Sequence, residues 1–252
     1  TPILHIFLEK ALDIVIKWIN EQNISTLKHR IVTTPGRTPV LFCTVEASDP
    51  SITETVLCYS HLDKQPPMLP WSDGLGPYSP VFTDGKLYGR GGADDGYGVY
   101  SVITALQILQ EQKLSHGRVV ILLEFCEESG SFDLPYYVKA LEEDIGTSSL
   151  VVCLDSGCGN YEQLWLTMSL RGVIAGTLTV NIADQGVHSG VGSGIMPSTF
   201  RIIRELLDRI EDVTSGEVIV KECWTDIPPE HIKYAQDTVD VLGKELIAVY
   251  PF

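Results

Sequence analysis

Histidine and carboxylate side chains directly follow three apolar runs of this sequence, at 55–59, 118–125 and 149–154. In chain order they are His61, Asp63, Glu127, Glu128 and Asp155. Imidazole and carboxylate groups are ligands that a borderline divalent ion such as zinc accepts in proteins. If the three runs are neighbouring strands of an open sheet, these side chains meet at its carboxyl edge, where α/β proteins place their sites. The pattern therefore favours a metal-dependent centre at that edge.

Asp94 is a sixth candidate, because it lies where the glycine-rich segment 89–96 turns into a helix. Each candidate also has an ordinary structural explanation. An acid at a helix start suits a cap and the helix dipole, and an aspartate before Ser-Gly suits an Asx-turn. A histidine or a glutamate pair at a strand end can simply be hydrogen-bonded or solvated. Only the joint placement of all six favours metal binding over these explanations.

The chemistry of the side chains suggests a division of roles. A rigidly held carboxylate can bridge two metal ions about 3.5–4 Å apart. Asp63 follows His61 by two residues on extended chain and faces the same side, so it can fix the imidazole tautomer. Glu127 and Glu128 are adjacent and point in different directions. One can hold a metal while the other takes a proton from a metal-activated water, whose pKa falls to about 7.

The apolar pattern up to residue 170 predicts an α/β layer. An amphipathic helix is expected from the stripe that begins at Ile3 and Phe7 and ends at Ile19. Further elements are expected as strands at 39–45, 55–59, 118–125 and 149–154, and as helices at 94–112 and 134–143. Strand–helix–strand alternation indicates a largely buried sheet. The turn-rich segment 64–92 is long enough to suggest a packed wall of an active site.

The pattern changes after residue 170. A half-exposed strand is expected at 173–182, a helix at 198–210 and a short strand at 217–220. These elements predict a smaller α+β unit. We therefore expect two domains, at residues 1–170 and 171–252.

The bulk composition excludes several classes of protein. The formal net charge is −15 and no lysine or arginine cluster is present, so nucleic-acid binding is not expected. The first helix is too short and too charged to span a bilayer, no signal peptide is visible, and no membrane association is expected. The six cysteines form no C-x-x-C pair, and Cys43, Cys58, Cys126 and Cys153 lie in apolar runs. Buried free thiols in a cytoplasmic protein fit better than disulfides or a thiolate metal site.

Five motifs, in this order, resemble one known family. They are Tyr-Ser-His-Leu-Asp at 59–63, Leu-Tyr-Gly-Arg-Gly-Gly-Ala-Asp-Asp at 87–95, Glu-Glu-Ser-Gly-Ser at 127–131, Asp-Ser-Gly at 155–157 and Val-His-Ser-Gly at 187–190. The family is that of the cocatalytic zinc peptidases and amidohydrolases, which includes carnosinase, cytosolic nonspecific dipeptidase, carboxypeptidase G, aminoacylase and succinyl-diaminopimelate desuccinylase. Gln65, Pro66 and the length of the following loop resemble its carnosinase-like branch.

The resemblance implies a mixed, mostly parallel sheet flanked by helices, plus a smaller α+β lid and dimerisation domain. It implies metal ligands at His61, Asp94, Glu128 and Asp155. Asp94 would bridge two divalent ions, one shared with His61 and Asp155 and the other with Glu128. Zinc is expected, although manganese and cobalt suit the same ligands.

Three further roles come from the resemblance. Glu127 would be the general base and Asp63 the hydrogen-bond partner of His61. His188, in the lid, would act in the active site of the partner subunit of a homodimer, where a positioned donor stabilises charge on the substrate. Without the resemblance, His188 would be a histidine in a glycine-rich surface turn.

The sequence departs from the family pattern at two points. The family has a lysine and a glycine shortly after the bridging aspartate, whereas here the text is Asp95-Gly96-Tyr97-Gly98. The histidine of the second metal lies beyond the lid in longer family members, and no other histidine here has a suitable context. We therefore expect a chain that is incomplete at its C-terminus.

The expected function is hydrolysis of the amide bond of dipeptides or small peptides. Asp155 leans toward the dipeptidase side of the family. An N-acyl amino acid deacylase or carboxypeptidase using the same site is the first alternative. A truncated, non-catalytic chain that only binds metal is the second.

Overall fold

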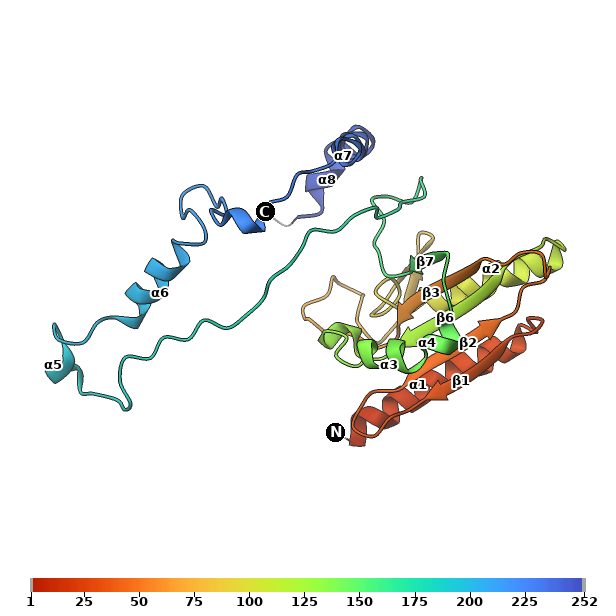
Figure 1. Cartoon of the computed structure of the whole chain (residues 1–252), viewed down its shortest axis with the longest axis horizontal. Coiled ribbons are helices and arrows are strands. Elements are labelled where there is room, and N and C mark those ends of the chain that lie inside the picture. The colour runs from red at the N-terminus through yellow and green to blue at the C-terminus, as the bar shows by residue number, and fades with distance from the viewer. Residues whose placement is uncertain (1, 251–252) are drawn as a thin grey trace. The chain divides into compact units, whose positions relative to one another are not determined.

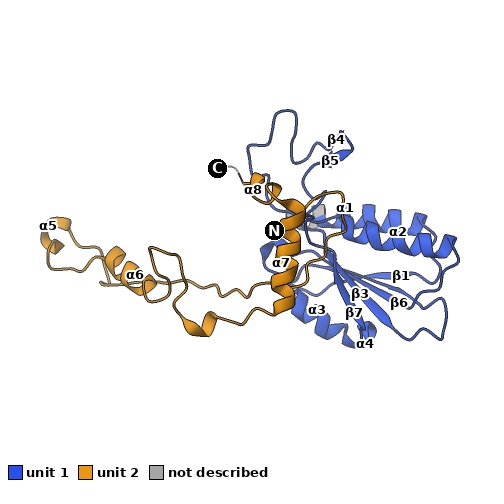
Figure 2. Cartoon of the chain, turned by 90° about the horizontal axis from the view of Figure 1, so that it is seen from above, with its two compact units in different colours: residues 1–158 blue, residues 159–252 orange. Residues whose placement is uncertain are grey.

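The computed structural model describes residues 2–250 and divides the chain into two compact units, Thr1–Cys158 and Gly159–Phe252. Unit 1 contains the sheet and unit 2 contains helices joined by extended segments (Figures 1 and 2). The domain boundary at residue 170 stays a prediction.

Unit 1 is built on a five-stranded mixed sheet in the order β1-β2-β6-β3-β7. The strands are β1 Lys28–Val32, β2 Val40–Val45, β6 Arg118–Glu124, β3 Thr55–His61 and β7 Leu150–Cys153. β1 and β2 pair antiparallel, as do β2 and β6, whereas β3 runs parallel to both β6 and β7. The predicted mixed sheet flanked by helices is confirmed, and the three runs that carry the candidate residues are adjacent parallel strands.

Helices cover both faces of the sheet (Figure 2). The long helices α1 (Pro2–Glu21) and α2 (Tyr97–Glu111) pack on one face, and α3 (Leu134–Ala140) and α4 (Glu142–Ile145) pack on the other. Alternation along β2 divides its side chains between the two cores, because successive residues of a strand point to opposite faces. Leu41 and Cys43 belong to the first core and Phe42 to the second.

The predicted stripe of the first helix explains how α1 is held. Leu12, Val15 and Ile19 are buried in the first core, and burying such a side chain contributes about 1.5–3 kcal/mol. The side chains of Ile3 and Phe7, which belong to the same predicted stripe, lie outside the described residues.

Gly98 brings the start of α2 against the end of β3. A Cβ atom at this position would lie 2.7 Å from Ser60 Oγ and 3.2 Å from Leu154 Cβ. Only glycine allows this approach, which places the turn before α2 beside the carboxyl edge of the sheet.

Three local features of unit 1 differ from the sequence-based expectation. The charged strand β1 was not predicted, because Lys28, His29 and Arg30 do not read as a strand, although an edge strand tolerates such residues. The segment 64–92 contains a small hairpin of β4 (Val81–Thr83) and β5 (Lys86–Tyr88). The helix expected at 134–143 breaks at Leu141 into α3 and α4.

Unit 2 differs more. Its helices are α5 (Ser189–Gly192), α6 (Thr199–Leu207), α7 (Pro229–Leu242) and α8 (Glu245–Ala248), with a 3-10 turn at Lys221–Cys223. The strands predicted at 173–182 and 217–220 are wrong, since residues 159–250 contain only an isolated bridge between Glu211 and Val218. An alternating sequence becomes a strand only where another strand pairs with it, and the described part of unit 2 offers no such partner to 173–182.

Cysteine burial follows the sheet. Cys43, Cys58 and Cys126 are buried as predicted, but Cys153 is exposed, because β7 is an edge strand. Within residues 2–250, no helix is both long and apolar enough to cross a membrane.

Candidate metal centre

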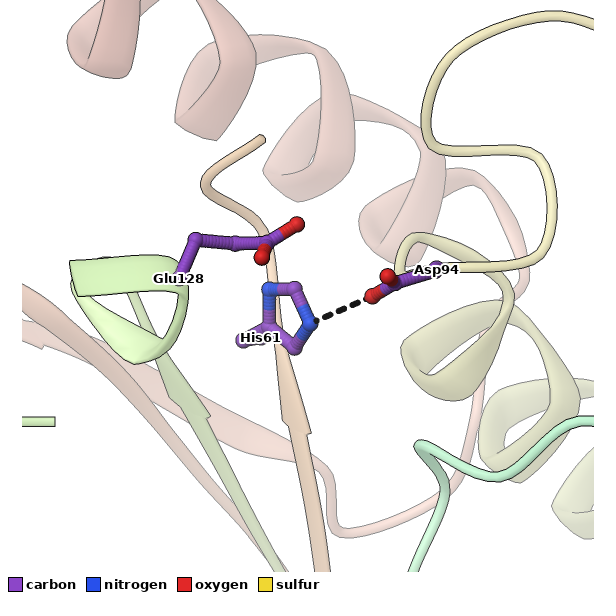
Figure 3. A group of neighbouring side chains, drawn as sticks. All are labelled: His61, Asp94 and Glu128. Atoms are coloured by element: carbon purple, nitrogen blue, oxygen red, sulfur yellow. Dashed lines mark hydrogen bonds and ion pairs between the residues drawn. The ribbon is translucent and has the colours of Figure 1, made fainter. Parts of the chain in front are cut away.

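His61 is the centre of the candidate site. It is the last residue of β3 and its side chain is fully buried. Its Nε2 atom lies 3.1 Å from Asp94 Oδ1, 3.4 Å from Asp155 Oδ1 and 3.7 Å from Glu127 Oε2. Figure 3 shows the imidazole between the side chains of Asp94 and Glu128, with Nε2 directed at Asp94. One imidazole nitrogen therefore faces carboxylates from three other segments of the chain.

Parallel strand pairing explains this convergence. His61 is opposite Glu124 in the β3–β6 register, and the N–H of Leu62 donates to the Glu124 carbonyl at 2.9 Å. On the other side, the N–H of Leu154 donates to the Tyr59 carbonyl at 2.8 Å. The residues that follow all three strands thus emerge at the same edge.

Asp63 connects the histidine with the glutamate pair. Its Oδ1 atom lies 3.4 Å from His61 Nδ1 and accepts the N–H of Glu127 at 3.1 Å, while Oδ2 accepts the N–H of Glu128 at 3.0 Å. The carbonyl oxygen of Asp63 also lies 3.1 Å from His61 Nδ1. With Nδ1 facing these oxygens as donor, Nε2 is left as the ligand atom. Asp63 thereby orients the imidazole and the 3-10 turn Glu127–Ser129 together.

Gln65 holds the carboxylate of Glu128. Its backbone N–H donates to Glu128 Oε1 at 3.2 Å, and its Nε2 donates to Oε2 at 2.6 Å. Sequence reasoning used Gln65 only as a mark of resemblance and missed this contact. Its position two residues after Asp63 was the available signal, because residues that follow a strand at a site face the same edge.

Asp95 is a second residue that sequence reasoning missed. Asp94 is exposed, with 63% of its side chain accessible, whereas Asp95 is fully buried. Asp95 Oδ2 accepts the backbone N–H of His61 at 3.0 Å, and Oδ1 accepts the N–H of Gly98 at 3.4 Å. Asp95 therefore takes the helix-start contact that was considered for Asp94, and Asp94 stays free to face His61 Nε2.

The electrostatics separate the acids of the site. Burial opposes the ionised form of Asp63, but hydrogen bonds from His61, Glu128 and Glu127 outweigh it and hold the pKa of Asp63 below its usual value. Burial raises the pKa of Glu127, and His61 only partly opposes this shift. Asp63 thus stays a fixed anion, whereas Glu127 is better suited to exchange a proton.

The imidazole itself responds to the surrounding acids. Burial disfavours the charged ring, but the hydrogen bond to Asp63 and the charges of Asp155, Asp63 and Asp95 outweigh it and raise the pKa of His61 to about 9. The negative charges of several carboxylates around one buried ring repel one another, so a positive charge among them stabilises the site. A proton on His61 supplies one such charge, and a bound cation would supply more.

The donor set fits divalent ions. Two overlapping groups each bring their ligand atoms within 4.8 Å of one another: His61, Asp94 and Glu128, and His61, Glu127 and Asp155. Nitrogen and carboxylate oxygen donors of this kind suit zinc at about 2.0–2.2 Å. Asp94 and Asp155 fall in different groups, and Glu127 belongs to one of them. The assignment of each residue to ligand or base stays a prediction.

His188 lies in unit 2. It precedes α5 and its Nδ1 accepts the N–H of Gly190 at 3.1 Å, and its side chain is exposed. This contact belongs to the local turn, and the proposed catalytic role of His188 stays a prediction.

Comparison with known proteins identifies the family. Residues 57–234 match the model of peptidase family M20/M25/M40, a span that includes every candidate site residue. The chain belongs to peptidase family M20/M25/M40. The resemblance found in the five motifs is thereby confirmed.

The M20/M25/M40 relatives include named dipeptidases. The chain is 30% identical over 210 residues to the Beta-Ala-His dipeptidase of Rattus norvegicus, covering 81% of this chain and 42% of that protein. It is 27% identical over 224 residues to the Cys-Gly metallodipeptidase dug1 of Schizosaccharomyces pombe, covering 81% and 45%. The chain therefore spans less than half the length of these curated relatives.

A solved structure supports the M20 fold. The crystal structure of human carnosine dipeptidase 1 superposes with a TM-score of 0.60 and 21% identity, covering 100% of this chain and 55% of that one. The arrangement of strands and helices around the candidate centre is therefore that of the family.

Proposed function

We propose that this chain carries the metal centre of a dipeptidase, which hydrolyses the amide bond of dipeptides or small peptides with a metal-activated water. The observation that carries the proposal is His61 Nε2, which faces Asp94, Asp155 and Glu127 at 3.1, 3.4 and 3.7 Å. The names of the relatives, a Beta-Ala-His dipeptidase and a Cys-Gly metallodipeptidase, support the substrate class.

The residues that would hold two divalent ions are His61, Asp94, Glu128 and Asp155. Asp94 is exposed enough for its carboxylate to contact both ions. The hydrogen bonds from Gln65 fix the orientation of the Glu128 carboxylate. Zinc is the ion we propose, with manganese and cobalt as alternatives. Bound ions of this kind polarise a substrate carbonyl and lower the pKa of water to about 7.

Glu127 is the proposed general base. It takes a proton from the attacking water and returns it to the leaving amine, which needs a carboxylate whose pKa lies above the usual range. Burial raises the pKa of Glu127 in this direction. Asp63 contacts the imidazole of His61 and the N–H groups of Glu127 and Glu128, and so fixes the position of the ring relative to the turn that carries Glu127.

The proposal extends to the assembly. His188 would act as a donor toward the substrate in a homodimer formed through residues 171–252. The buried free thiols Cys43, Cys58 and Cys126 suit a reducing, cytoplasmic setting.

The test uses the full chain, stripped with a chelator and reloaded with zinc or manganese. Metal content per chain is measured first. Release of product is then followed with β-alanyl-histidine, cysteinyl-glycine and an N-acetyl amino acid. Metal-dependent cleavage of the dipeptides supports the proposal. Cleavage of the N-acetyl substrate alone would assign a deacylase, and metal binding without any cleavage would assign a non-catalytic chain.

A further inference from the structure

The ammonium group of Lys64 lies inside the acidic centre. Its Nζ donates to the carbonyl oxygens of Leu62 at 2.7 Å and Asp63 at 3.2 Å, and to that of Asp95. The first two carbonyls follow β3 and the third belongs to the turn before α2. One side chain therefore ties together the two segments that carry His61 and Asp94.

Three carbonyl acceptors match the three N–H donors of an ammonium group. A lysine is a compact point charge on a flexible stem, and its donors can diverge toward separate acceptors, whereas the planar fork of arginine cannot. The contacts all go to backbone oxygens, so they fix the path of the chain and leave the carboxylates of Asp63 and Asp95 available for other partners.

Gly91 makes room for this side chain. It has a φ of +82°, and a Cβ atom there would lie 2.6 Å from Lys64 Cδ and closer still to Cε. Contacts this short do not occur between carbon atoms, so any larger residue at position 91 would displace Lys64. The glycine-rich turn and the lysine are thus fitted to each other.

A second set of hydrogen bonds connects Lys64 with His61. Asp95, whose carbonyl accepts from Lys64, also accepts the backbone N–H of His61 through its side chain at 3.0 Å. Lys64 and Asp95 together form a closed connection between the end of β3 and the turn before α2. Asp94 immediately precedes Asp95 in that turn, and its carboxylate is 3.1 Å from His61 Nε2.

We propose that Lys64 is a positioning residue, which clamps the Asp94–Asp95 turn onto the end of β3 through the Asp95 carbonyl and so sets the distance between His61 and Asp94. The proposal rests on the metal centre of the proposed function.

The first test measures zinc affinity by calorimetric titration of the full chain. Lys64→Met keeps the length of the side chain and removes the donors. It should raise the zinc Kd by about 10–100-fold, as loss of groups that orient metal ligands does. Lys17→Met, which removes an exposed lysine of α1, should leave the Kd unchanged. An unchanged Kd for Lys64→Met overturns the proposal.

Gly91→Ala provides a second variant that alters no charged group. It should also raise the zinc Kd, because it displaces Lys64 and adds backbone strain at a φ of +82°, two effects that the double-mutant cycle below separates. If Lys64→Met does not fold, this variant decides, and an unchanged zinc Kd for Gly91→Ala overturns the proposal.

A double-mutant cycle in metal-free protein tests the clamp itself. Thermal unfolding is measured for the wild type, Gly91→Ala, Lys64→Ala and the double variant. Gly91→Ala should lower the Tm clearly less in the Lys64→Ala background, since the clash is then gone, whereas equal losses in both backgrounds overturn the clamp. If the wild type binds no zinc, the proposed function is contradicted. The double-mutant cycle would still test whether Lys64 positions the turn, because it is measured in metal-free protein.

Discussion

The Nε2 atom of His61, the last residue of β3, lies 3.4 Å from Oδ1 of Asp155, which follows β7. Their approach depends on the parallel pairing of β3 with β7, in which Tyr59 is opposite Cys153. A one-residue slip in this register would turn Asp155 to the other face of the sheet. The site is therefore a product of sheet register as much as of its own side chains.

Glu127→Gln should strongly slow catalysis and leave metal binding intact. The amide cannot accept the proton of water, and loss of a general base lowers the rate by about 10²–10⁴-fold. Hydrolysis of β-alanyl-histidine and zinc content per chain are measured side by side. Glu111→Gln, an exposed position at the end of α2, is the matched control and should keep full activity. Full activity in Glu127→Gln would rule out the proposed base.

Asp63→Asn should weaken metal binding. The uncharged amide loses the pairing with His61 and offers only one oxygen to the N–H groups of Glu127 and Glu128. Such orienting groups are worth about 10–100-fold in metal affinity. Calorimetric zinc titration checks this, with the exposed Asp13→Asn as control. An identical zinc affinity in Asp63→Asn would show that the ring needs no such partner.

Asp133→Asn should destabilise unit 1 in a pH-dependent way. Asp133 accepts from Thr38 N at 2.9 Å, Thr38 Oγ1 at 3.0 Å and Arg37 at 2.7 Å, which joins the β1–β2 connection to the start of α3. Burial opposes the ionised form, but these hydrogen bonds outweigh it and hold the pKa of Asp133 below its ordinary value of 3.8. Hydrogen bonds to a charged group contribute about 1.5–3 kcal/mol, so a loss of this order is expected at neutral pH.

The sign of the pH effect follows from the lowered pKa of Asp133. Its stabilisation is fully present above the unfolded pKa of 3.8 and is lost as the pH falls through the lower, folded pKa. Urea unfolding of the wild type and Asp133→Asn at several pH values should show their difference shrinking below pH 3.8. A difference that stays constant, or that grows on acidification, contradicts this ion pair.

Thiol reactivity should divide the cysteines into two classes. Burial raises the pKa of Cys43 to about 12 and that of Cys58 to about 11, and the thiolate is the reactive form. In the native protein only Cys153, Cys158 and Cys223 should react rapidly with a disulfide reagent, and denaturant should expose all six. Rapid native labelling of Cys43 or Cys58, mapped by mass spectrometry, would contradict the packing of the first core.

The sequence predicted the site edge well because the evidence was local. His61 ends β3, Glu127 lies three residues after the end of β6, and Asp155 lies two residues after the end of β7. The apolar runs alone therefore indicated where these side chains would emerge. Lys64 and Gln65 were missed because their partners, the Asp95 carbonyl and the Glu128 carboxylate, are distant in sequence. A contact of that kind depends on the fold, and the residues around Lys64 and Gln65 show no periodic pattern that would predict it.

In unit 2 the sequence pattern predicted strands that the structure does not contain. The segment 173–182 alternates like a strand, but alternation states only which side chains would share a face. Whether a strand forms depends on pairing, and within the described residues of unit 2 the isolated bridge between Glu211 and Val218 is the only pairing, which leaves 173–182 without a partner. The helix that begins at Pro229 could be anticipated from residues 228–231, because a proline at a helix start is a purely local signal.

Anomalous diffraction at the zinc edge, from crystals of the zinc-loaded chain, tests the central claim most directly. We expect an anomalous peak about 2.0–2.2 Å from His61 Nε2, within bonding distance of carboxylate oxygens of Asp94 or Asp155. Zinc bound only elsewhere on the chain, with no peak beside His61, would contradict the metal centre and the dipeptidase function built on it.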